Sequence, residues 1–553
     1  MTAKAGKFKL RFDFWSIVKY TAIVLLIVFL VYPTFRLFFL SISDNKGGFT
    51  LKYFKTFFTK AYYYRTLKNS FATSGITTVF AILLGVPMAY ITTRYNIWLK
   101  KTIDILVIMS LMSPPFIGAY SWIVLLGRNG FVTKLFEKIG ITIPPIYGFG
   151  GIVLVFTLKY FPYVYLYVSG ALKSIDRSLE EAAENLGSGK LRRILTITLP
   201  VIMPTLGASA IMVFMSSLAD FGTPMLIGEG YKVLPVLVYE EFMSEMGGNA
   251  NMAGALSIIV ILCSTTVLLL QKYVISRKNY MMNATRPPAV IEVSKGKKLL
   301  LTSLCMFVTI LAFLPQVVVI VTSFIKTNGP IFVEGFSLGS YEKIFYKIPK
   351  NIANTFIFSF IAIAIIVVFG MLLSYLFVKR KSKTTGMLDV LVMLPYVIPG
   401  AVLGVSMLVA FNKPPLMLSG TAAIMIIAYV IRKMPHTVRS STAILYQIDP
   451  SIEEASINLG VSPMKTFFKI TAPMMAPGVL SGAILSWITT INELSSSIML
   501  YGGKTATISV SIYTEVVRSN YGTAAALASI LTVTTMLSLV LFNRVSKGKV
   551  SVV

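Results

Sequence analysis

Long apolar runs, separated by short polar segments, dominate the hydrophobic pattern of the chain. Each run is close to the roughly 20 residues that a helix needs to cross a bilayer core of about 30 Å. A helix is favoured in lipid because it satisfies its own backbone hydrogen bonds. We therefore expect about twelve membrane-spanning helices. They are expected near residues 16–40, 69–93, 103–126, 150–171, 201–222, 252–272, 299–325, 355–378, 387–411, 420–440, 474–500 and 522–543.

The composition agrees with a membrane location. Of the 553 residues, 55% are hydrophobic and only 13% are charged, and the mean hydropathy is +0.76. A soluble core cannot bury so many apolar side chains, because average globular chains carry about twice that fraction of charge. The first apolar run follows a basic start, but it is longer than the core of a signal peptide and lacks a small-residue cleavage site after it. We expect it to remain as an anchor.

The net charge of +29 raises the question of a nucleic-acid partner. If both termini are cytoplasmic, Lys and Arg are more numerous in the cytoplasmic segments than in the outward loops, as the positive-inside rule requires. Basic clusters such as KRKSK at 379–383 then indicate topology rather than a phosphate-binding patch. The expected partner is the lipid bilayer, and no nucleic acid is expected.

The chain is a tandem repeat. In the later part of each half, equivalent positions share one offset in residue number, which is the offset from Pro204 to Pro477. In the earlier part they share a larger offset, which is the offset from Pro114 to Pro399. We call these the later offset and the earlier offset. Their difference predicts a shorter outward loop between the third and fourth spans of the second half.

The repeat divides the chain into two halves. We expect a first half at 1–270, a basic cytoplasmic linker with two adjacent prolines at 271–298, and a second half at 299–553. Six spans per half is an even number, so both halves enter the membrane in the same orientation. The fold class is therefore all-α integral membrane, with two parallel six-helix repeats about a pseudo-twofold axis and a shared passage between them.

Two polar runs occupy equivalent places in the two halves. The first reads EEAAENLGSGKLRRILTITLP at 180–200, and the second reads EEASINLGVSPMKTFFKITAP at 453–473. Counting spans from a cytoplasmic N terminus puts both runs between the fourth and fifth spans of their half. Both are therefore expected on the cytoplasmic side, in loops at 176–200 and 449–473.

The second copy predicts a helix-turn-helix elbow. Asp449 suits the N-cap position, and Pro450 suits the first helical position, where a missing N–H costs nothing. Glu453 and Glu454 then fall in the first turns, where the helix dipole favours negative charge. Gly460 can adopt the left-handed conformation that ends a helix.

The first copy follows the same plan. Asp176 is the expected cap and Gly187 the expected turn, although Ser178 with Glu181 offers a competing capping box. Small side chains on both elbows let another surface approach closely; they are Ala182, Ala183, Ala455 and Ser456. Such an exposed face suits docking into a groove on a cytoplasmic partner. The alternative is an ordinary amphipathic interfacial helix, but two copies at equivalent places favour docking.

The two runs carry a family resemblance. The chain resembles the integral membrane permeases of bacterial binding-protein-dependent ABC importers, whose signature loop, the EAA motif, reads approximately E-A-A-x3-G-x9-I-x-L-P. The first copy matches it at Glu181, Ala182, Ala183, Gly187, Ile197, Leu199 and Pro200. The second copy matches it at Glu454, Ala455, Gly460, Ile470 and Pro473. It departs from the motif at Ser456, which is nearly as small as alanine, and at Ala472.

The resemblance implies a type I ABC importer permease fold in a bacterial inner membrane. In that family the loop is a coupling helix that fits a cleft in a separate ATP-hydrolysing subunit. It therefore implies two copies of such a subunit and an extracytoplasmic substrate-binding protein as partners. It also implies that ATP and Mg²⁺ bind to the partner and no cofactor to this chain, which is not an enzyme and has no catalytic residues. The strings GSGKL at 187–191 and GGKT at 502–505 lack the pattern of a phosphate-binding loop.

The ATPase-contact residues implied by the resemblance come from both elbows. They are Glu180, Glu181, Ala182, Ala183, Gly187, Glu453, Glu454, Ala455, Ser456 and Gly460. No metal site is expected, because the two cysteines fall in different spans and His436 is the only histidine in the chain.

Two pairs of charged residues are candidates for the substrate pathway. Asp220 and Glu493 are equivalent, and membrane-embedded carboxylates are functional candidates because they are costly. The alternative is that each lies at a helix end, where it is simply solvated or caps a turn. The surrounding strings ADFGTP and NELSSSIML are similar to fused ferric-iron-type permeases, which implies iron(III) as the substrate. Lys159 and Arg432 are also equivalent, and they would suit an anion such as a phosphate ester or a phosphonate. They could also snorkel or pair with a neighbour.

Several alternatives for the function are open at this point. Related fused permeases carry phosphorylated sugars, aminoethylphosphonate, thiamine or polyamines. A secondary transporter driven by an ion gradient would share twelve spans and parallel repeats, but it does not need paired elbows. A membrane enzyme is disfavoured, because no nucleophile-base or metal constellation repeats or clusters.

Overall fold

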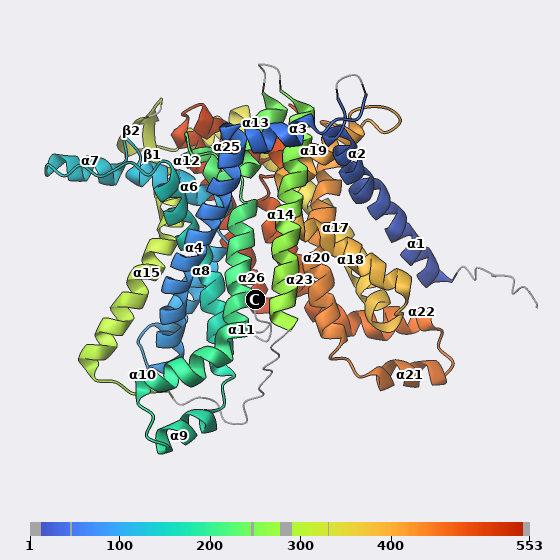
Figure 1. The fold of residues 1–553 in the computed structure, drawn as a ribbon, viewed down its shortest axis with the longest axis horizontal. Helices are drawn as coiled ribbons and strands as arrows, with labels where there is room; N and C mark the ends of the chain where they lie inside the picture. Colours follow the sequence, from blue (N-terminus) through green and yellow to red (C-terminus); the bar gives the residue numbers. More distant parts are fainter. Residues whose placement is uncertain (1–12, 45–46, 245–247, 277–289, 330, 546–553) are drawn as a thin grey trace, which may run out of the picture.

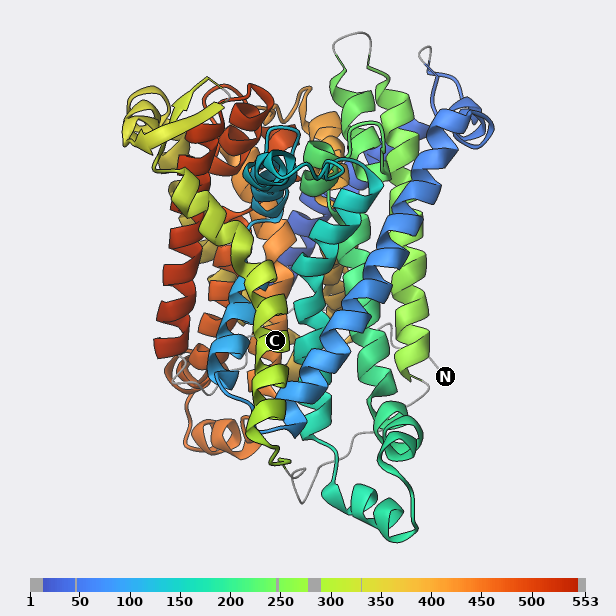
Figure 2. The same ribbon diagram turned by 90° about the vertical axis from the view of Figure 1, so that its left-hand side faces the viewer.

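The protein is a bundle of membrane-length helices with a short helical elbow at the same end of each half (Figures 1 and 2). The computed structural model describes the chain except for residues 1–12, 45–46, 245–247, 277–289, 330 and 546–553. We call the end of the bundle that carries the elbows the elbow end, and the other the opposite end. Since both elbows lie at one end, the prediction that the two polar runs share one side is confirmed.

The first half contains fourteen α-helices and two π-helical turns, η1 and η2, in the described residues. They are α1 (Phe14–Leu26), η1 (Ile27–Val31), α2 (Tyr32–Ser41), α3 (Lys52–Thr59), α4 (Ala61–Arg94), α5 (Lys100–Leu111), α6 (Pro115–Leu126), α7 (Phe131–Lys138), α8 (Phe149–Lys173), α9 (Arg177–Asn185), α10 (Lys190–Arg193), η2 (Ile194–Thr198), α11 (Leu199–Ala219), α12 (Gly222–Ile227), α13 (Leu234–Met243) and α14 (Ala250–Ser276).

The second half repeats this order and adds a short β-hairpin, which the all-α prediction lacked. Its elements are α15 (Lys295–Thr322), β1 (Ile325–Asn328), β2 (Ile331–Phe336), α16 (Gly339–Lys347), α17 (Pro349–Lys379), α18 (Lys383–Val397), α19 (Gly400–Phe411), α20 (Ala422–Leu445), α21 (Pro450–Asn458), α22 (Pro463–Thr466), η3 (Phe467–Thr471), α23 (Ala472–Ile491), α24 (Ser497–Leu500), α25 (Ile508–Val517) and α26 (Tyr521–Val545). The strands β1 and β2 are antiparallel.

Nine helices of the described chain are long and apolar enough to cross a membrane, or up to eleven if each of two bent pairs is one span. The bent pairs correspond to the expected spans 103–126 and 387–411, which are broken rather than continuous. In the second half, α18 and α19 meet at an angle of 110°. The remaining expected span, 420–440, forms α20, whose Arg432, Lys433 and Arg439 make it less apolar than the others.

Proline explains both breaks. Pro114 precedes α6 and Pro399 precedes α19, each as the N-cap residue. Proline lacks the N–H that would continue the helix and disfavours a helical conformation in the residue before it. The chain therefore stops one helix and starts another in a new direction at the same place in each half.

The predicted difference in loop length is confirmed. The first half carries α7 between its third and fourth spans, whereas the second half connects α19 directly to α20. The predicted linker at 271–298 lies partly outside the described residues, which omit 277–289: α14 extends to Ser276, and α15 begins at Lys295.

The first helix of each half packs against helices of the other half. The helices α1 and α2, at the start of the chain, lie beside α17, α18 and α19 of the second half (Figure 1). There Trp15 stacks on Tyr375 with ring centroids 4.3 Å apart, and Phe467 meets both rings edge-on. Such aromatic pairs contribute about 0.5–1.5 kcal/mol each beyond their buried area.

The reciprocal contact involves α15, the first helix of the second half, which packs against α5 and α6 of the first half. The hydroxyl of Ser121 in α6 donates to the carbonyl of Pro315 in α15 at 2.8 Å. The two halves are therefore interlocked rather than merely adjacent.

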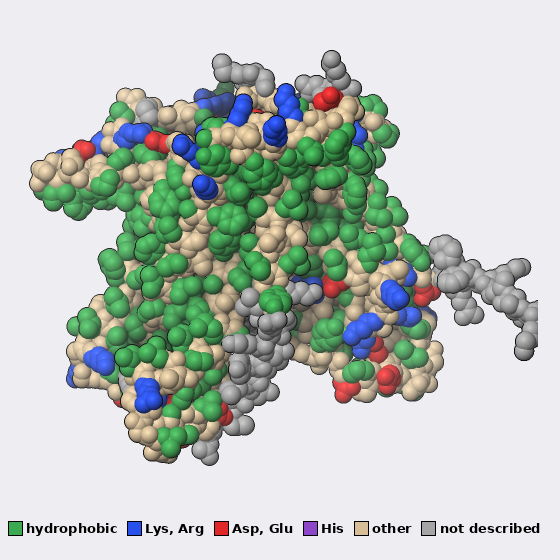
Figure 3. Space-filling model, in the orientation of Figure 1, with side chains coloured by type: hydrophobic (Ala, Val, Ile, Leu, Met, Phe, Trp, Pro, Cys, Tyr) green, Lys and Arg blue, Asp and Glu red, His purple; other side chains and the backbone are tan. Residues whose placement is uncertain are grey.

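The surface matches a membrane environment. On the face shown in Figure 3, apolar side chains predominate over the middle of the bundle, and most Lys, Arg, Asp and Glu side chains lie toward the two ends. Large apolar side chains of the long helices, such as Leu83, Phe307 and Phe360, are exposed. In water such a surface would be unfavourable, whereas in lipid it faces hydrocarbon.

Candidate functional site

The elbow of the second half has the predicted capping geometry. The side chain of Asp449 accepts a hydrogen bond from the backbone N–H of Ser451 at 2.9 Å, and Pro450 is the first residue of α21. This hydrogen bond lowers the pKa of Asp449. Gly460 ends the helix with φ +84°, and Ser462 caps α22. The prediction of a helix, a glycine turn and a second helix is confirmed.

The elbow of the first half is built in the same way. Asp176 accepts from the N–H of Ser178 at 2.9 Å, so Asp176 is the cap and the competing capping box does not form. Gly187 has φ +75°. A left-handed backbone costs an ordinary residue about 1–2 kcal/mol, which explains the glycine at this turn in both copies.

The predicted coupling residues lie on two different faces. Ala182, Gly187, Glu454, Ala455 and Gly460 are exposed, and Glu181 and Ala183 are partly exposed. Ser456 is buried and exchanges a hydrogen bond of 2.9 Å with Thr466 of α22.

The acidic residues that begin the two motif runs, Glu180 and Glu453, point toward the membrane helices. Glu180 pairs with Arg94, and Glu453 is buried beside Lys379. These two carboxylates are therefore separate from the outward face of the elbows.

Two leucines at the tips of the elbows were missed by the sequence analysis. Leu186 is 87% exposed and Leu459 is 84% exposed, and each immediately precedes the turn glycine of its elbow. They are related by the later offset and are therefore equivalent. An apolar residue at the tip of a polar elbow, present in both copies, is the signal that could have identified them.

The charged pathway candidates of the first half form an ion pair. Lys159 in α8 donates to Oδ2 of Asp220, directly after α11, at 2.6 Å. The hydroxyl of Tyr160 donates to the same oxygen at 2.8 Å, and the backbone N–H of Thr223 donates to Oδ1 at 3.0 Å. The carboxylate of Asp220 is thus fully engaged by its own half.

The second half repeats this arrangement with an additional cation. Arg432 in α20 pairs with Glu493, which lies two residues after the last residue of α23. Lys433, which was not among the predicted residues, also pairs with Glu493, at 2.6 Å. The guanidinium of Arg432 lies against Gly400 at the start of α19, where an added Cβ atom would overlap it, so that the guanidinium would have to move.

The carboxylates and cations were considered separately in the sequence, as contacts for a cation or for an anion. The structure instead pairs them within each half, Lys159 with Asp220, and Arg432 and Lys433 with Glu493. We call these five residues the ion-pair layer. With their ordinary charges these five groups carry one net positive charge. Pairing of this kind compensates most of the cost of burying charge.

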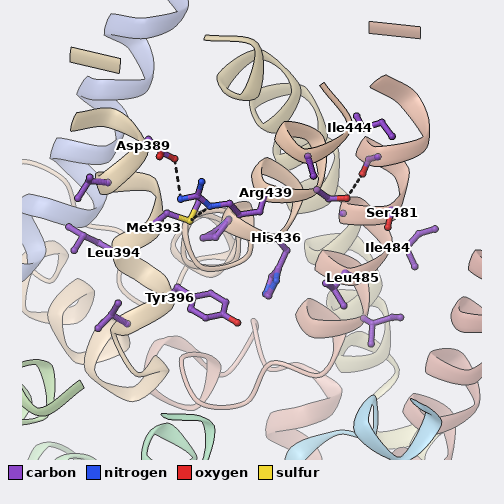
Figure 4. Close-up of a pocket in the computed structure, with 18 of the residues that line it drawn as sticks. Asp389, Met393, Leu394, Tyr396, His436, Arg439, Ile444, Ser481, Ile484 and Leu485 are labelled. Carbon is purple, nitrogen blue, oxygen red and sulfur yellow. Dashed lines mark hydrogen bonds and ion pairs between the residues drawn. The ribbon is translucent and has the colours of Figure 1, made fainter. Parts of the chain in front are cut away.

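A cavity of about 1080 Å³ lies between the two halves. Tyr167 of α8 lines it from the first half, and residues of α18, α20 and α23 line it from the second half, among them Tyr396, His436 and Ser481. Figure 4 shows Tyr396 and His436 directed into the same space, with Arg439 turned toward Asp389. In the described part of the chain, no group of three or more His, Cys, Asp or Glu side chains could hold a metal ion.

The cavity lies on the elbow side of the ion-pair layer. His436 follows Arg432 by one helical turn along α20, and the cavity-lining residues further along the chain, Arg439 in α20 and Gln447 just after it, continue toward the elbow. Along α20 the ion-pair residues therefore lie nearer the opposite end of the bundle than the cavity does.

Comparisons with known proteins agree with the repeat. The family profile described as "Binding-protein-dependent transport system inner membrane component" matches twice, at residues 81–280 and 366–550. The "Ferric transport system permease protein FbpB" of Actinobacillus pleuropneumoniae is 29% identical over 529 residues, which cover 94% of this chain and 76% of the relative. The "Putative ferric transport system permease protein FbpB 1" of Haemophilus influenzae is 29% identical over 86% of this chain and 76% of the relative.

Among solved structures, a bacterial alginate ABC transporter in complex with an alginate pentasaccharide-bound periplasmic protein has a chain that covers 49% of this one. That match covers 96% of the solved chain, with a TM-score of 0.41 and 19% sequence identity. The two profile matches together cover more than half of the sequence, one in each half. The chain therefore belongs to the family of binding-protein-dependent transport system inner membrane components.

Proposed function

We propose that this chain is the fused permease of an ATP-driven importer and carries ferric iron across the bacterial inner membrane. An extracytoplasmic binding protein delivers the cargo at the opposite end of the bundle. Two copies of a cytoplasmic ATPase subunit bind at the elbow end, which places both termini in the cytoplasm. ATP and Mg²⁺ bind to these subunits.

The observation that carries this proposal is the matched pair of elbows. Both lie at one end of the bundle, and each presents an exposed leucine, Leu186 or Leu459, next to small side chains. A soluble partner with an apolar groove can bury these leucines, each burial contributing about 1.5–3 kcal/mol. A transporter driven by an ion gradient has no use for two such docking elements, so the ATP-driven class is favoured.

The cavity and the ion-pair layer form the pathway in this proposal. The cavity lies between the halves on the elbow side of the ion-pair residues, and in this proposal the layer closes it toward the opposite end. This arrangement corresponds to an inward-facing state. Opening toward the binding protein then requires the two halves to move relative to each other at the layer.

The assignment of ferric iron rests on the relatives that span most of the chain. The "Putative 2-aminoethylphosphonate transport system permease protein PhnV" of Salmonella typhimurium is 26% identical over only 42% of this chain. An anionic cargo is also less favoured than the sequence suggested, because the cationic side chains are already paired. Lys159 is neutralised by Asp220, and Arg432 and Lys433 share Glu493.

Transport in reconstituted liposomes tests this function. The permease, its ATPase subunits and its binding protein are incorporated, and uptake of radiolabelled ferric iron is compared with uptake of labelled 2-aminoethylphosphonate. ATP-dependent uptake of iron alone is expected. Uptake of phosphonate alone would contradict the cargo, and gradient-driven uptake without the ATPase subunits would contradict the transport class.

A further inference from the structure

Glu180 connects the first elbow to two membrane helices. Its carboxylate pairs with Arg94, the last residue of α4, whose side chain is buried. The hydroxyl of Thr198 donates to the same carboxylate oxygen at 3.3 Å. Since Thr198 ends the π-helical turn that leads into α11, one side chain joins the elbow to α4 and to the start of α11.

Glu453 makes the same connections in the second half. Its carboxylate lies 3.4 Å from Nζ of Lys379, the last residue of α17, and accepts a hydrogen bond from the hydroxyl of Thr471. Thr471 ends the π-helical turn η3 and leads into α23. Both Glu453 and Thr471 are buried.

We call Arg94, Glu180 and Thr198 the first triad, and Lys379, Glu453 and Thr471 the second triad. The two triads are equivalent under the internal repeat. Glu180 and Glu453 are related by the later offset, and so are the two threonines. The cations Arg94 and Lys379 are related by the earlier offset. The triads thus combine positions from both parts of each half. Both also use a π-helical turn, which is rare and is found mostly at functional sites.

The elbows do not need these triads in order to form. The first α-helix of each elbow, α9 or α21, is capped by its own aspartate and ends next to its own turn glycine. The first elbow also contains the surface ion pairs Arg177 with Glu181 and Arg193 with Glu184, both at 2.5 Å. What the triads add is a connection from a preformed elbow to helices of the bundle.

We infer that Glu180 and Glu453 are positioning residues that transmit displacement of each elbow to the membrane helices. The inference rests on the proposed function, because it presumes that an ATPase moves the elbows. Without the glutamate, α9 and α21 lose their side-chain link to the end of α4 or α17, and the glycine turn is what joins them to α10 or α22, which continue through the π-helical turns into α11 and α23. A movement of the elbow would then be absorbed at the turn instead of moving α4 with α11, or α17 with α23.

The test uses the full complex of permease, ATPase subunits and binding protein in liposomes, and measures cargo transported per ATP hydrolysed. The double variant Glu180→Gln with Glu453→Gln is expected to retain its ATPase subunits and to hydrolyse ATP, while cargo per ATP falls by about tenfold or more. The variant Glu229→Gln is the matched control, because it removes a glutamate from an exposed ion pair with Arg128 and should leave the ratio unchanged.

A charge exchange separates transmission from simple loss of a side chain. The variant Arg94→Glu with Glu180→Arg restores an ion pair in the first half. On the background of intact Glu453 it is expected to recover most of the cargo-per-ATP ratio that Glu180→Gln alone loses. Thr198→Val and Thr471→Val keep both ion pairs, so they are expected to lower the ratio less than the glutamate variants.

Three results would overturn the inference. One is an unchanged cargo-per-ATP ratio in the double glutamate variant. A second is loss of the ATPase subunits from that variant, since the glutamates would then act in docking rather than in transmission. The third is an equal loss of the ratio in Glu229→Gln. Failure of the unmodified permease to bind ATPase subunits would instead refute the proposed function, so the two failures are distinguishable.

Discussion

Lys159 and Asp220 form a buried ion pair at 2.6 Å between α8 and the end of α11, and the internal repeat places Arg432 and Glu493 in the same relationship. The equivalence means that the pairing belongs to the repeated unit rather than to one half. Each pair joins the fourth span of its half to the end of the fifth. The halves differ in Lys433, which gives the second cluster an extra positive charge.

Removing one partner of the first pair should destabilise the protein. Asp220→Asn leaves Lys159 without its counter-charge in a buried site, and breaking a buried pair costs about 3–5 kcal/mol. The expected result is a lower midpoint of thermal unfolding in detergent. The double variant Lys159→Met with Asp220→Asn removes both charges and should regain most of the lost stability.

The double variant also separates structure from transport. If the pair serves only to hold the helices, the double variant should transport at the rate of the unmodified protein. If the layer must open and close, the double variant should be stable and yet transport poorly. Equal stability of Asp220→Asn and the unmodified protein would contradict the burial of the pair.

The turn glycines should be sensitive to any side chain. Gly187 and Gly460 have φ angles of +75° and +84°, and a Cβ atom at either position would have no neighbour within 4 Å, so the cost of substitution is backbone strain alone. Valine there should cost about 1–2 kcal/mol or more, distort the elbow and lower uptake. ATPase co-purification and uptake measure this.

A control for the glycine variants lies in the same elbow. Gly189 also has open space around it but has no left-handed backbone angle. Gly189→Val should therefore have little effect on uptake. Normal uptake and normal ATPase co-purification by both Gly187→Val and Gly460→Val would show that the turns need no glycine.

The exposed leucines at the elbow tips should govern docking. Replacing Leu186 and Leu459 by serine removes apolar surface that a partner would bury, which should weaken ATPase binding by about tenfold or more. Binding is measured by titrating purified ATPase subunits onto the permease in detergent. Tyr346→Ser, at a side chain that is 88% exposed in α16, is the matched control. Unchanged affinity in the double leucine variant would exclude the tips from the interface.

A bulky side chain in the cavity should obstruct transport. Ser481 of α23 lines the cavity, and its neighbour Leu480 is exposed on the outer surface of the same helix. Ser481→Trp is expected to reduce uptake while ATPase binding is retained, because it fills space between the halves. Leu480→Trp places the same ring outside the cavity and should leave uptake normal. Equal uptake by both variants would place the pathway elsewhere.

The sequence predicted the elbows well because their determinants are local. Asp449, Pro450 and Gly460 act within a few residues of their own positions, so capping rules suffice. The breaks before α6 and α19 were missed, although Pro114 and Pro399 indicated them. Hydropathy is averaged over a window of residues and carries no information about the direction of the helix axis.

The contacts between distant segments could not be predicted in this way. The stacking of Trp15 on Tyr375 joins residues of opposite halves, and nothing near either residue indicates its partner. The pairing of Lys159 with Asp220 is an intermediate case. Both positions were identified because charge is costly in lipid. The same cost favours pairing of opposite charges, so the candidate anion contact Lys159 and the candidate cation contact Asp220 form one ion pair.

The composition of the purified transport complex tests the central claim most directly. Native mass spectrometry measures how many nucleotide-hydrolysing subunits accompany each permease chain. We predict two, one for each elbow, with the number falling when Leu186 and Leu459 are both replaced by serine. A permease that transports its cargo with no such subunit bound would contradict the account.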